Sequence, residues 1–129
     1  MTASGRATDG LSGLARLNRA THVGITALAW AFRNEEAFRL EVLGSVVLLP
    51  LALWLGRGGA ERALLCAAVI QVMIVELLNT GIEVVVDRIS IERHALSGLA
   101  KDLGSAAVMI SLLLATVVWA AVLLSRLFS

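Results

Sequence analysis

Charged residues, cysteine and proline are all scarce in this chain of 129 residues. Only 16% of the residues are charged, against about 25% in an average soluble domain, whereas 58% are hydrophobic. The 11 basic and 10 acidic residues nearly cancel, which argues against a disordered chain and against a nucleic-acid binder driven by bulk positive charge. The length is that of one domain. We therefore predict a small integral membrane protein in which residues 1–129 form a single unit.

Other classes are excluded by motifs that the chain does not contain. Cys66 alone cannot build a disulfide framework or a cysteine-rich metal site, and its apolar neighbours in sequence indicate a small buried residue. No secretory signal is expected, since the first long apolar run begins near Val42 without a cleavage pattern before it. There is no Gly-x-x-x-x-Gly-Lys loop and no protein-kinase signature, so a nucleotide site here would not use those scaffolds.

Long apolar runs indicate membrane-spanning helices. The charge-free runs cover residues 42–56, 63–75 and 103–125. A helix needs about 20 residues to cross about 30 Å of hydrocarbon, so the first run must begin near Phe38 and the second must continue past Glu76. Pro50 lies inside the first helix, where membrane helices tolerate it. We predict an all-α integral membrane fold whose three transmembrane helices cover residues 38–55, 63–89 and 101–126, with a polar loop over residues 90–98.

Residues 11–33 show the pattern of an amphipathic helix. With about 100° between successive residues, five apolar residues fall within an arc of about 80°, and the basic residues fall on the other side. The five are Leu14, Leu17, Ile25, Leu28 and Phe32. This predicts a surface helix along the cytoplasmic leaflet, acting either as an anchor or as a wall of a lipid-facing site. Residues 1–10, which are rich in small and polar types, are expected to be disordered.

The basic residues predict an orientation in the membrane. In a three-span chain eight of them lie on one side and three on the other. Because cytoplasmic segments carry the excess of Lys and Arg, we predict a multi-pass inner-membrane protein with a cytoplasmic N-terminus and an external C-terminus. The cytoplasmic set is Arg6, Arg16, Arg19, Arg33, Arg39, Arg88, Arg93 and Lys101, and the external set is Arg57, Arg62 and Arg126.

The second span carries a ladder of polar residues that an ordinary membrane helix lacks. Glu76, Asn79, Glu83 and Asp87 lie within about 80° of one another on a helix. An acid at mid-membrane costs about 2.5–3.5 kcal/mol, so such acids are functional-site candidates by default. Three interpretations remain: a catalytic site, the proton relay of an ion carrier, or acids that pair with a partner in an assembly subunit.

Further polar clusters occur on the predicted cytoplasmic side. Glu35 follows the surface helix at the depth of Glu83, and two carboxylates at an interface suit Mg²⁺ shared with phosphates. The alternative is a solvated charge run at the membrane border. A third cluster consists of Glu92-Arg93-His94 followed by Lys101-Asp102. Its Lys101 could neutralise a phosphate, whereas His94 alone is typical of a loop histidine.

Three motifs together resemble the prokaryotic diacylglycerol kinases, and the resemblance covers residues 14–125. The motifs are Asn34-Glu35-x-Ala-Phe-Arg-x-Glu41, Glu76-x-x-Asn79-x-x-x-Glu83-x-x-x-Asp87-Arg-Ile and Glu92-x-His94-x-Leu-Ser-Gly-x-Ala-Lys101-Asp102-x-Gly-Ser-Ala-Ala. The resemblance implies three transmembrane helices plus a surface helix in a homotrimer whose active sites are shared between protomers. It also implies phosphoryl transfer from MgATP to the hydroxyl of diacylglycerol, with no nucleic-acid partner.

The resemblance implies a role for each motif residue. Glu76 is similar to the general base, Asn79 to a residue that supports the reacting groups, and Glu35 and Glu83 to the Mg²⁺ ligands. The residues that resemble the nucleotide site are Arg16, Glu35, Glu83, Glu92, Arg93, His94, Lys101 and Asp102. Those that resemble the lipid site are Arg39, Glu41, Glu76, Ser105 and Trp119.

The chain departs from the family pattern at residues 22–27, at Ala95 and at Leu99. These departures concern the lipid preference and the outer nucleotide contacts. Another branch of the family phosphorylates undecaprenol, which is therefore the alternative substrate. The stretch from Lys101 to Ala107 is more similar to the diacylglycerol branch.

Overall fold

Four helices make up almost all of the described part of the chain. The computed structural model describes residues 9–89, 92 and 94–128. The helices are α1 (Asp9–Asn34), α2 (Glu36–Leu55), α3 (Gly59–Ile89) and α4 (Ala95–Ser125). The last three are long and apolar enough to cross a membrane, in agreement with the number of spans that the sequence predicts. Residues 1–8, for which the sequence predicts disorder, lie outside the described residues, whereas Asp9 and Gly10 already belong to α1.

The helices begin earlier than the sequence predicts. α1, α2 and α3 begin two to four residues before the predicted positions, and α4 begins at Ala95 instead of residue 101. The expected polar loop therefore ends at His94, whose Nδ1 accepts a hydrogen bond from the Leu96 N–H at 3.1 Å and caps the free donors of α4. With 31 residues each, α3 and α4 are about 46 Å long and exceed the hydrocarbon thickness.

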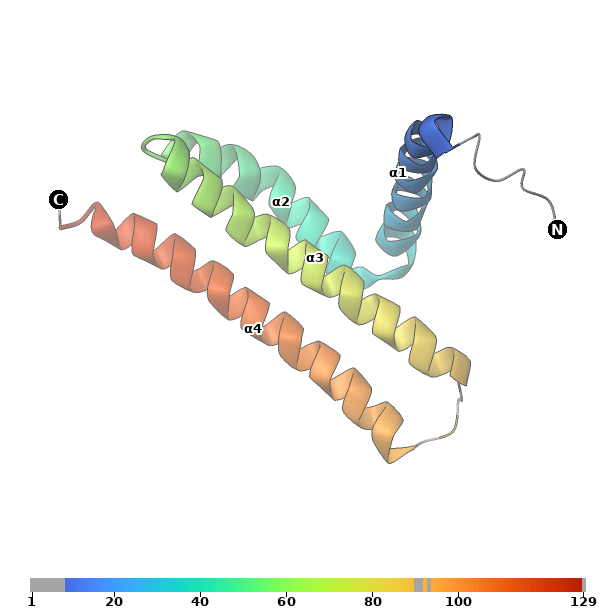
Figure 1. Cartoon of the computed structure of the whole chain (residues 1–129). Helices are drawn as coiled ribbons and strands as arrows, with labels where there is room; N and C mark the ends of the chain where they lie inside the picture. The colour runs from blue at the N-terminus through green and yellow to red at the C-terminus, as the bar shows by residue number, and fades with distance from the viewer. Residues whose placement is uncertain (1–8, 90–91, 93, 129) are drawn as a thin grey trace.

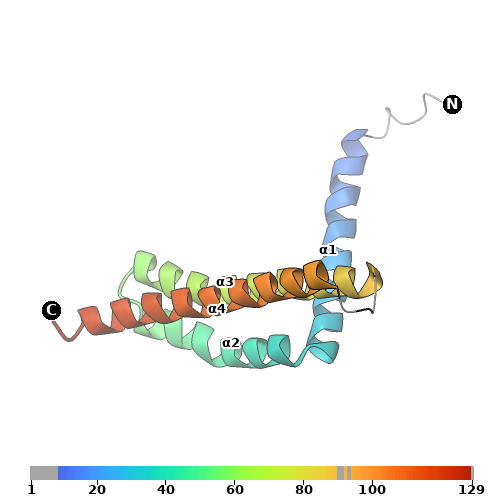
Figure 2. The same cartoon turned by 90° about the horizontal axis from the view of Figure 1, so that it is seen from below.

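The three spans lie side by side with α3 in the middle, and α1 leaves them at a steep angle (Figures 1 and 2). Within its apolar stretch α3 buries 39% of the residues, whereas α4 buries only 11%. Large apolar side chains such as Leu43, Val46 and Leu113 are accordingly exposed on α2 and α4. α3 thus forms the centre of the fold, and its buried face is where side chains from the other spans converge.

One stripe of α3 makes the packing surface. Most of its buried residues lie one, three or four positions from the next, as expected for one helix face. They are Leu65, Ala68, Val69, Val72, Glu76, Asn79, Thr80 and Val86. Small buried residues on the neighbouring spans, such as Ala52, Gly104 and Ser111, let the backbones approach closely.

Two hydrogen bonds fix α4 on α3 within the apolar region. Gln71 donates from Nε2 to the Ser111 carbonyl at 2.7 Å, and Trp119 donates from Nε1 to the Leu65 carbonyl at 3.2 Å. Each bond ends on a backbone carbonyl of the other helix. They set the register of α4, and with it the height at which its polar residues face the ladder on α3.

A compact turn closes the end of the spans that lies opposite to the acidic ladder. Gly58 has a φ of 87°, a conformation that glycine adopts without strain. Glu61 accepts the Arg57 N–H at 2.6 Å and lies 3.5 Å from an Arg126 guanidinium nitrogen. Glu61 therefore joins the α2–α3 turn to the end of α4.

Candidate active site

Glu76 lies where the buried stripe of α3 changes from apolar to polar residues. Its exposed fraction is 6%, and Asn79 one turn later is 8% exposed. Along the ladder burial then falls, since Glu83 is half-buried and Asp87 is exposed. Glu76 lies 13 residues before the end of α3 at Ile89, or about 20 Å along the helix. The ladder thus runs from an enclosed carboxylate to a solvent-accessible one.

Three carboxylates from three segments lie near Glu76. The Glu76 side chain interacts electrostatically with those of Glu83 and Glu35, and Glu41 interacts with Glu76. Glu83 belongs to α3 and Glu41 to α2, and Glu35 is the single residue between α1 and α2. Like charges repel when water is largely excluded, so this cluster favours a bound cation. The fold brings the two predicted metal ligands, Glu35 and Glu83, to the same carboxylate.

The carboxylates of this cluster fit a Mg²⁺ ion that the protein and a nucleotide bind jointly. Mg²⁺ is usually bound through one or two carboxylates, with waters and substrate phosphates completing its octahedron. Among the described residues, no three His, Cys, Asp or Glu side chains lie close enough to hold a metal by themselves. Glu35 and Glu83 would be the two protein ligands, and phosphate oxygens would supply further ones.

Asn79 is wedged between α3 and α4. Its Oδ1 is buried and has no hydrogen-bond partner among the described residues. The neighbouring backbone is that of Gly104 on α4, where an added Cβ would overlap with this oxygen. A glycine is therefore required at position 104 for Asn79 to keep its place, and a buried amide oxygen without a partner remains available to a ligand.

An ion pair joins α3 and α4 near the connection between them. Lys101 Nζ lies 2.6 Å from Asp87 Oδ1, and both side chains are substantially exposed, at 42% and 62%. Asp87 is the last residue of the predicted ladder, and Lys101 is the predicted phosphate contact. An exposed pair of this kind contributes little to stability, so Lys101 can exchange Asp87 for a phosphate at small cost.

The other residues that resemble a nucleotide site are not gathered in one place. Glu92 and Asp102 are exposed near the α3–α4 connection, His94 caps α4, and Arg93 lies outside the described residues. Arg16 is exposed on α1, 19 residues before Glu35, which is about 28 Å along the helix. A single chain therefore does not bring Arg16 to the carboxylate cluster.

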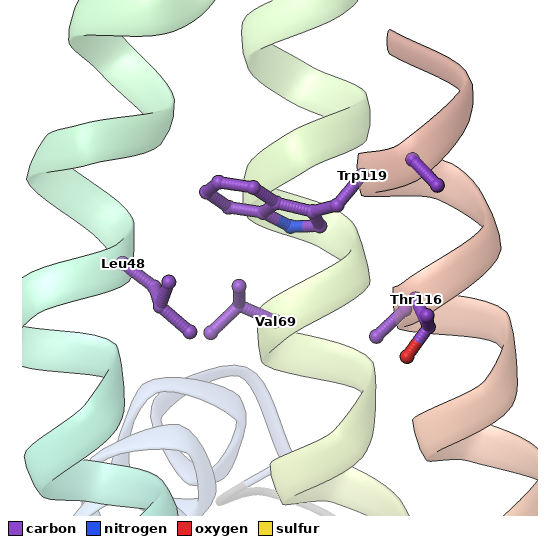
Figure 3. A pocket seen from close by; sticks show the side chains of 6 residues that line it. Leu48, Val69, Thr116 and Trp119 are labelled. Atoms are coloured by element: carbon purple, nitrogen blue, oxygen red, sulfur yellow. The ribbon is translucent and has the colours of Figure 1, made fainter. Parts of the chain in front are cut away.

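Two adjoining hollows run between the spans, beside the cluster. Trp119 reaches from α4 across α3 towards Leu48 of α2 and covers a hollow of about 380 Å³ (Figure 3). A second hollow of about 290 Å³ shares Leu48, Val69 and Ala115 with the first and has Glu41 in its lining. The lining is otherwise apolar apart from Thr116. Together the hollows form an apolar groove that reaches the carboxylate cluster at Glu41.

Of the remaining lipid-site candidates, one lines the groove and two lie elsewhere. Glu41 lines the groove, and its Oε2 is buried without a hydrogen-bond partner among the described residues. Ser105 is exposed on α4 and does not line either hollow. Arg39 bonds to backbone carbonyls at the end of α1. The groove residues Leu48 and Val69 were not singled out in the sequence, because apolar residues of a span carry no signal for such a role.

Comparisons with known proteins agree with the motifs. The family model described as prokaryotic diacylglycerol kinase matches residues 22–123. A diacylglycerol kinase of Pseudomonas aeruginosa is 50% identical over 115 residues, which cover 89% of this chain and 94% of the relative. That of Haemophilus influenzae is 46% identical over 112 residues, covering 87% and 95%. That of Escherichia coli K12 is 44% identical over 115 residues, covering 89% and 94%.

Proposed function

Because this chain belongs to the prokaryotic diacylglycerol kinase family, we propose that it transfers the γ-phosphoryl group of ATP to the hydroxyl of diacylglycerol. The product is phosphatidic acid, an intermediate of phospholipid metabolism. The proposal rests chiefly on the buried Glu76, which lies in a carboxylate cluster whose Glu41 also lines the apolar groove. A lipid hydroxyl from the groove and a metal-bound phosphate from the cluster could meet at Glu76.

Glu76 is the proposed general base. The lipid hydroxyl oxygen attacks the γ-phosphorus, the bond from phosphorus to the β–γ bridging oxygen breaks, and ADP leaves. The hydroxyl proton passes to Glu76 as the new bond develops. Phosphoryl transfer depends mainly on positioning and charge neutralisation. The buried Asn79, one turn after Glu76, would support the reacting groups in position.

The lipid enters sideways from the leaflet in this proposal. An acyl chain would lie in the groove below Trp119, with the glycerol end towards Glu41 and the hydroxyl towards Glu76. Most of the groove lining is apolar, which matches an acyl chain, and Glu41 is a polar group at the end that faces the cluster. Ser105 and Arg39 would then lie outside the acyl-chain path.

The nucleotide approaches from the cytoplasmic end. Glu35 and Glu83 would hold Mg²⁺, and the bound ion supplies charge neutralisation at the phosphates. Lys101 would leave Asp87 to contact a phosphate. The remaining proposed nucleotide contacts are Arg16, Glu92, Arg93, His94 and Asp102.

A homotrimer with shared active sites accounts for two features of the single chain. Arg16 lies about 28 Å along α1 from Glu35, so it could reach the cluster of a neighbouring protomer more readily than its own. The apolar residues of α1, among them Leu14, Leu17 and Ile25, are also exposed. We propose that this apolar arc lies on the cytoplasmic leaflet and on the neighbouring chain, which makes α1 an amphipathic surface helix.

Orientation in the inner membrane has a direct test. In a Cys66→Ala background, a single cysteine replaces either exposed Arg57 at the α2–α3 turn or exposed Arg88 at the end of α3. We expect Arg57→Cys to react with a membrane-impermeant thiol reagent in intact cells, and Arg88→Cys to react only after the cells are opened. The opposite pattern would put the carboxylates on the side without ATP and contradict the proposed function.

Mixed micelles containing the purified protein, MgATP and one lipid at a time test the reaction itself. We expect phosphate incorporation into diacylglycerol that depends on Mg²⁺, with a smaller rate for undecaprenol. A preference for undecaprenol would place this chain in the branch of the family that phosphorylates undecaprenol. Absence of turnover with both lipids would favour an ion carrier or an assembly subunit.

A further inference from the structure

The connection between α1 and α2 is a sharp elbow with Glu35 at its apex. α1 ends at Asn34 and α2 begins at Glu36, so Glu35 is the only residue between two long helices. Its backbone is extended, with φ of −112° and ψ of 109°. A one-residue connection leaves the angle between the helices dependent on a few bonds. That angle determines where the Glu35 carboxylate points.

Arg39 bridges this elbow. The helical hydrogen bonds of α1 end where the Glu35 N–H donates to the Ala31 carbonyl at 2.8 Å. The next two carbonyls, those of Phe32 and Arg33, accept from Arg39 Nε at 2.9 Å and from Nη2 at 2.8 Å. The guanidinium carbon also lies 5.9 Å from the centre of the Phe32 ring.

The chemistry of this contact is specific to arginine. Carbonyls of a last helical turn lack intrahelical donors and form the negative end of the helix dipole. A guanidinium offers two parallel N–H groups in a rigid fork, matches two adjacent carbonyls, and stacks on an aromatic face. Because Arg39 belongs to the first turns of α2, these bonds tie α2 to the end of α1 across Glu35.

We propose that Arg39 is a positioning residue, which fixes the α1–α2 elbow and so holds Glu35 towards Glu76 and Glu83, and that it does not bind the lipid. Two of its three nitrogens are engaged with the backbone of α1, and it is not among the residues that line the groove. The inference rests on the proposed function only in taking Glu35 as a ligand of Mg²⁺.

The elbow itself can be measured without any turnover. The distance across the elbow is measured by pulsed electron paramagnetic resonance between two spin labels. The labels are attached to Ala20→Cys in α1 and Val46→Cys in α2, in a Cys66→Ala background. Labelled chains are diluted into an excess of unlabelled chains, so that only distances within one chain contribute. We expect a narrow distribution for the parent and a clearly broader one for Arg39→Gln. Arg39→Lys retains the charge and one donor, and should be intermediate.

Kinetics then separate positioning from lipid binding. For Arg39→Gln we expect the Mg²⁺ concentration for half-maximal activity to rise about tenfold and kcat to fall, while KM for diacylglycerol is unchanged. Arg33→Gln is the matched control, since it removes the same charge next to the elbow and leaves the accepting carbonyl in place; it should behave as the parent. If Arg39→Gln does not assemble, Arg39→Lys is measured in its place.

Specific results would overturn the inference. One is an unchanged distance distribution in both Arg39 variants. Another is a raised KM for diacylglycerol with an unchanged Mg²⁺ requirement, which would make Arg39 a lipid contact. A parent protein without kinase activity whose elbow still loosens in Arg39→Gln would support the positioning role and contradict the proposed function, so the two failures are distinguishable.

Discussion

Replacement of Glu76 by glutamine is expected to reduce turnover about 10²–10⁴-fold, the usual contribution of a general base. Glutamine has nearly the same size and can occupy the same buried place, but its amide cannot accept the hydroxyl proton. The loss should appear in kcat, because neither the groove nor the proposed metal ligands are altered. Initial rates in mixed micelles, with diacylglycerol and MgATP varied separately, measure this effect.

The same variant should be at least as stable as the parent. Glu76 is nearly buried among the carboxylates of Glu35, Glu41 and Glu83, so its replacement by a neutral group relieves repulsion between like charges. We expect a thermal unfolding midpoint that is equal or higher. Glu36→Gln, an exposed acid in the first turn of α2, is the control and should affect neither quantity. Near-parent turnover in Glu76→Gln would show that another group takes the proton.

Removal of either proposed metal ligand is expected to weaken the binding of a non-hydrolysable MgATP analogue at least about tenfold, equivalent to about 1.4 kcal/mol. Glu35→Ala and Glu83→Ala each remove one of the two carboxylates that would hold the ion. The effect should diminish when the analogue is offered without Mg²⁺, since binding is then weak in the parent as well. Titration calorimetry in detergent gives the affinities.

The two ligand variants have a matched control and a clear contrary outcome. Glu36→Ala removes an exposed acid next to Glu35 and should leave the affinity of the MgATP analogue unchanged. The double variant Glu35→Ala, Glu83→Ala should bind the analogue no better with Mg²⁺ than without it. Parent-like affinity in both single variants would mean that Mg²⁺ is held elsewhere.

Apolar runs and helical periodicity were sufficient to predict the spans and the polar face of the second one. Three charge-poor segments long enough for the hydrocarbon became α2, α3 and α4. The spacing from Glu76 to Asn79 put both on one face, and the structure buries both. Span boundaries were less well predicted: residues 95–98 are polar or small in part, yet they are helical because His94 caps α4. Composition does not reveal such a cap.

What the sequence determined by itself was local: which segments are helical, which of them can cross a membrane, and which residues of one helix share a face. These follow from repeats of 3.6 residues and from hydrophobic length. Only the tertiary structure decided which faces meet. The approach of Glu41 and Glu35 to Glu76, the pairing of Lys101 with Asp87, and the bonds of Arg39 to the end of α1 all join different segments. Such contacts depend on the angle of the elbow and the register of packed helices, and no periodicity within a single helix encodes either.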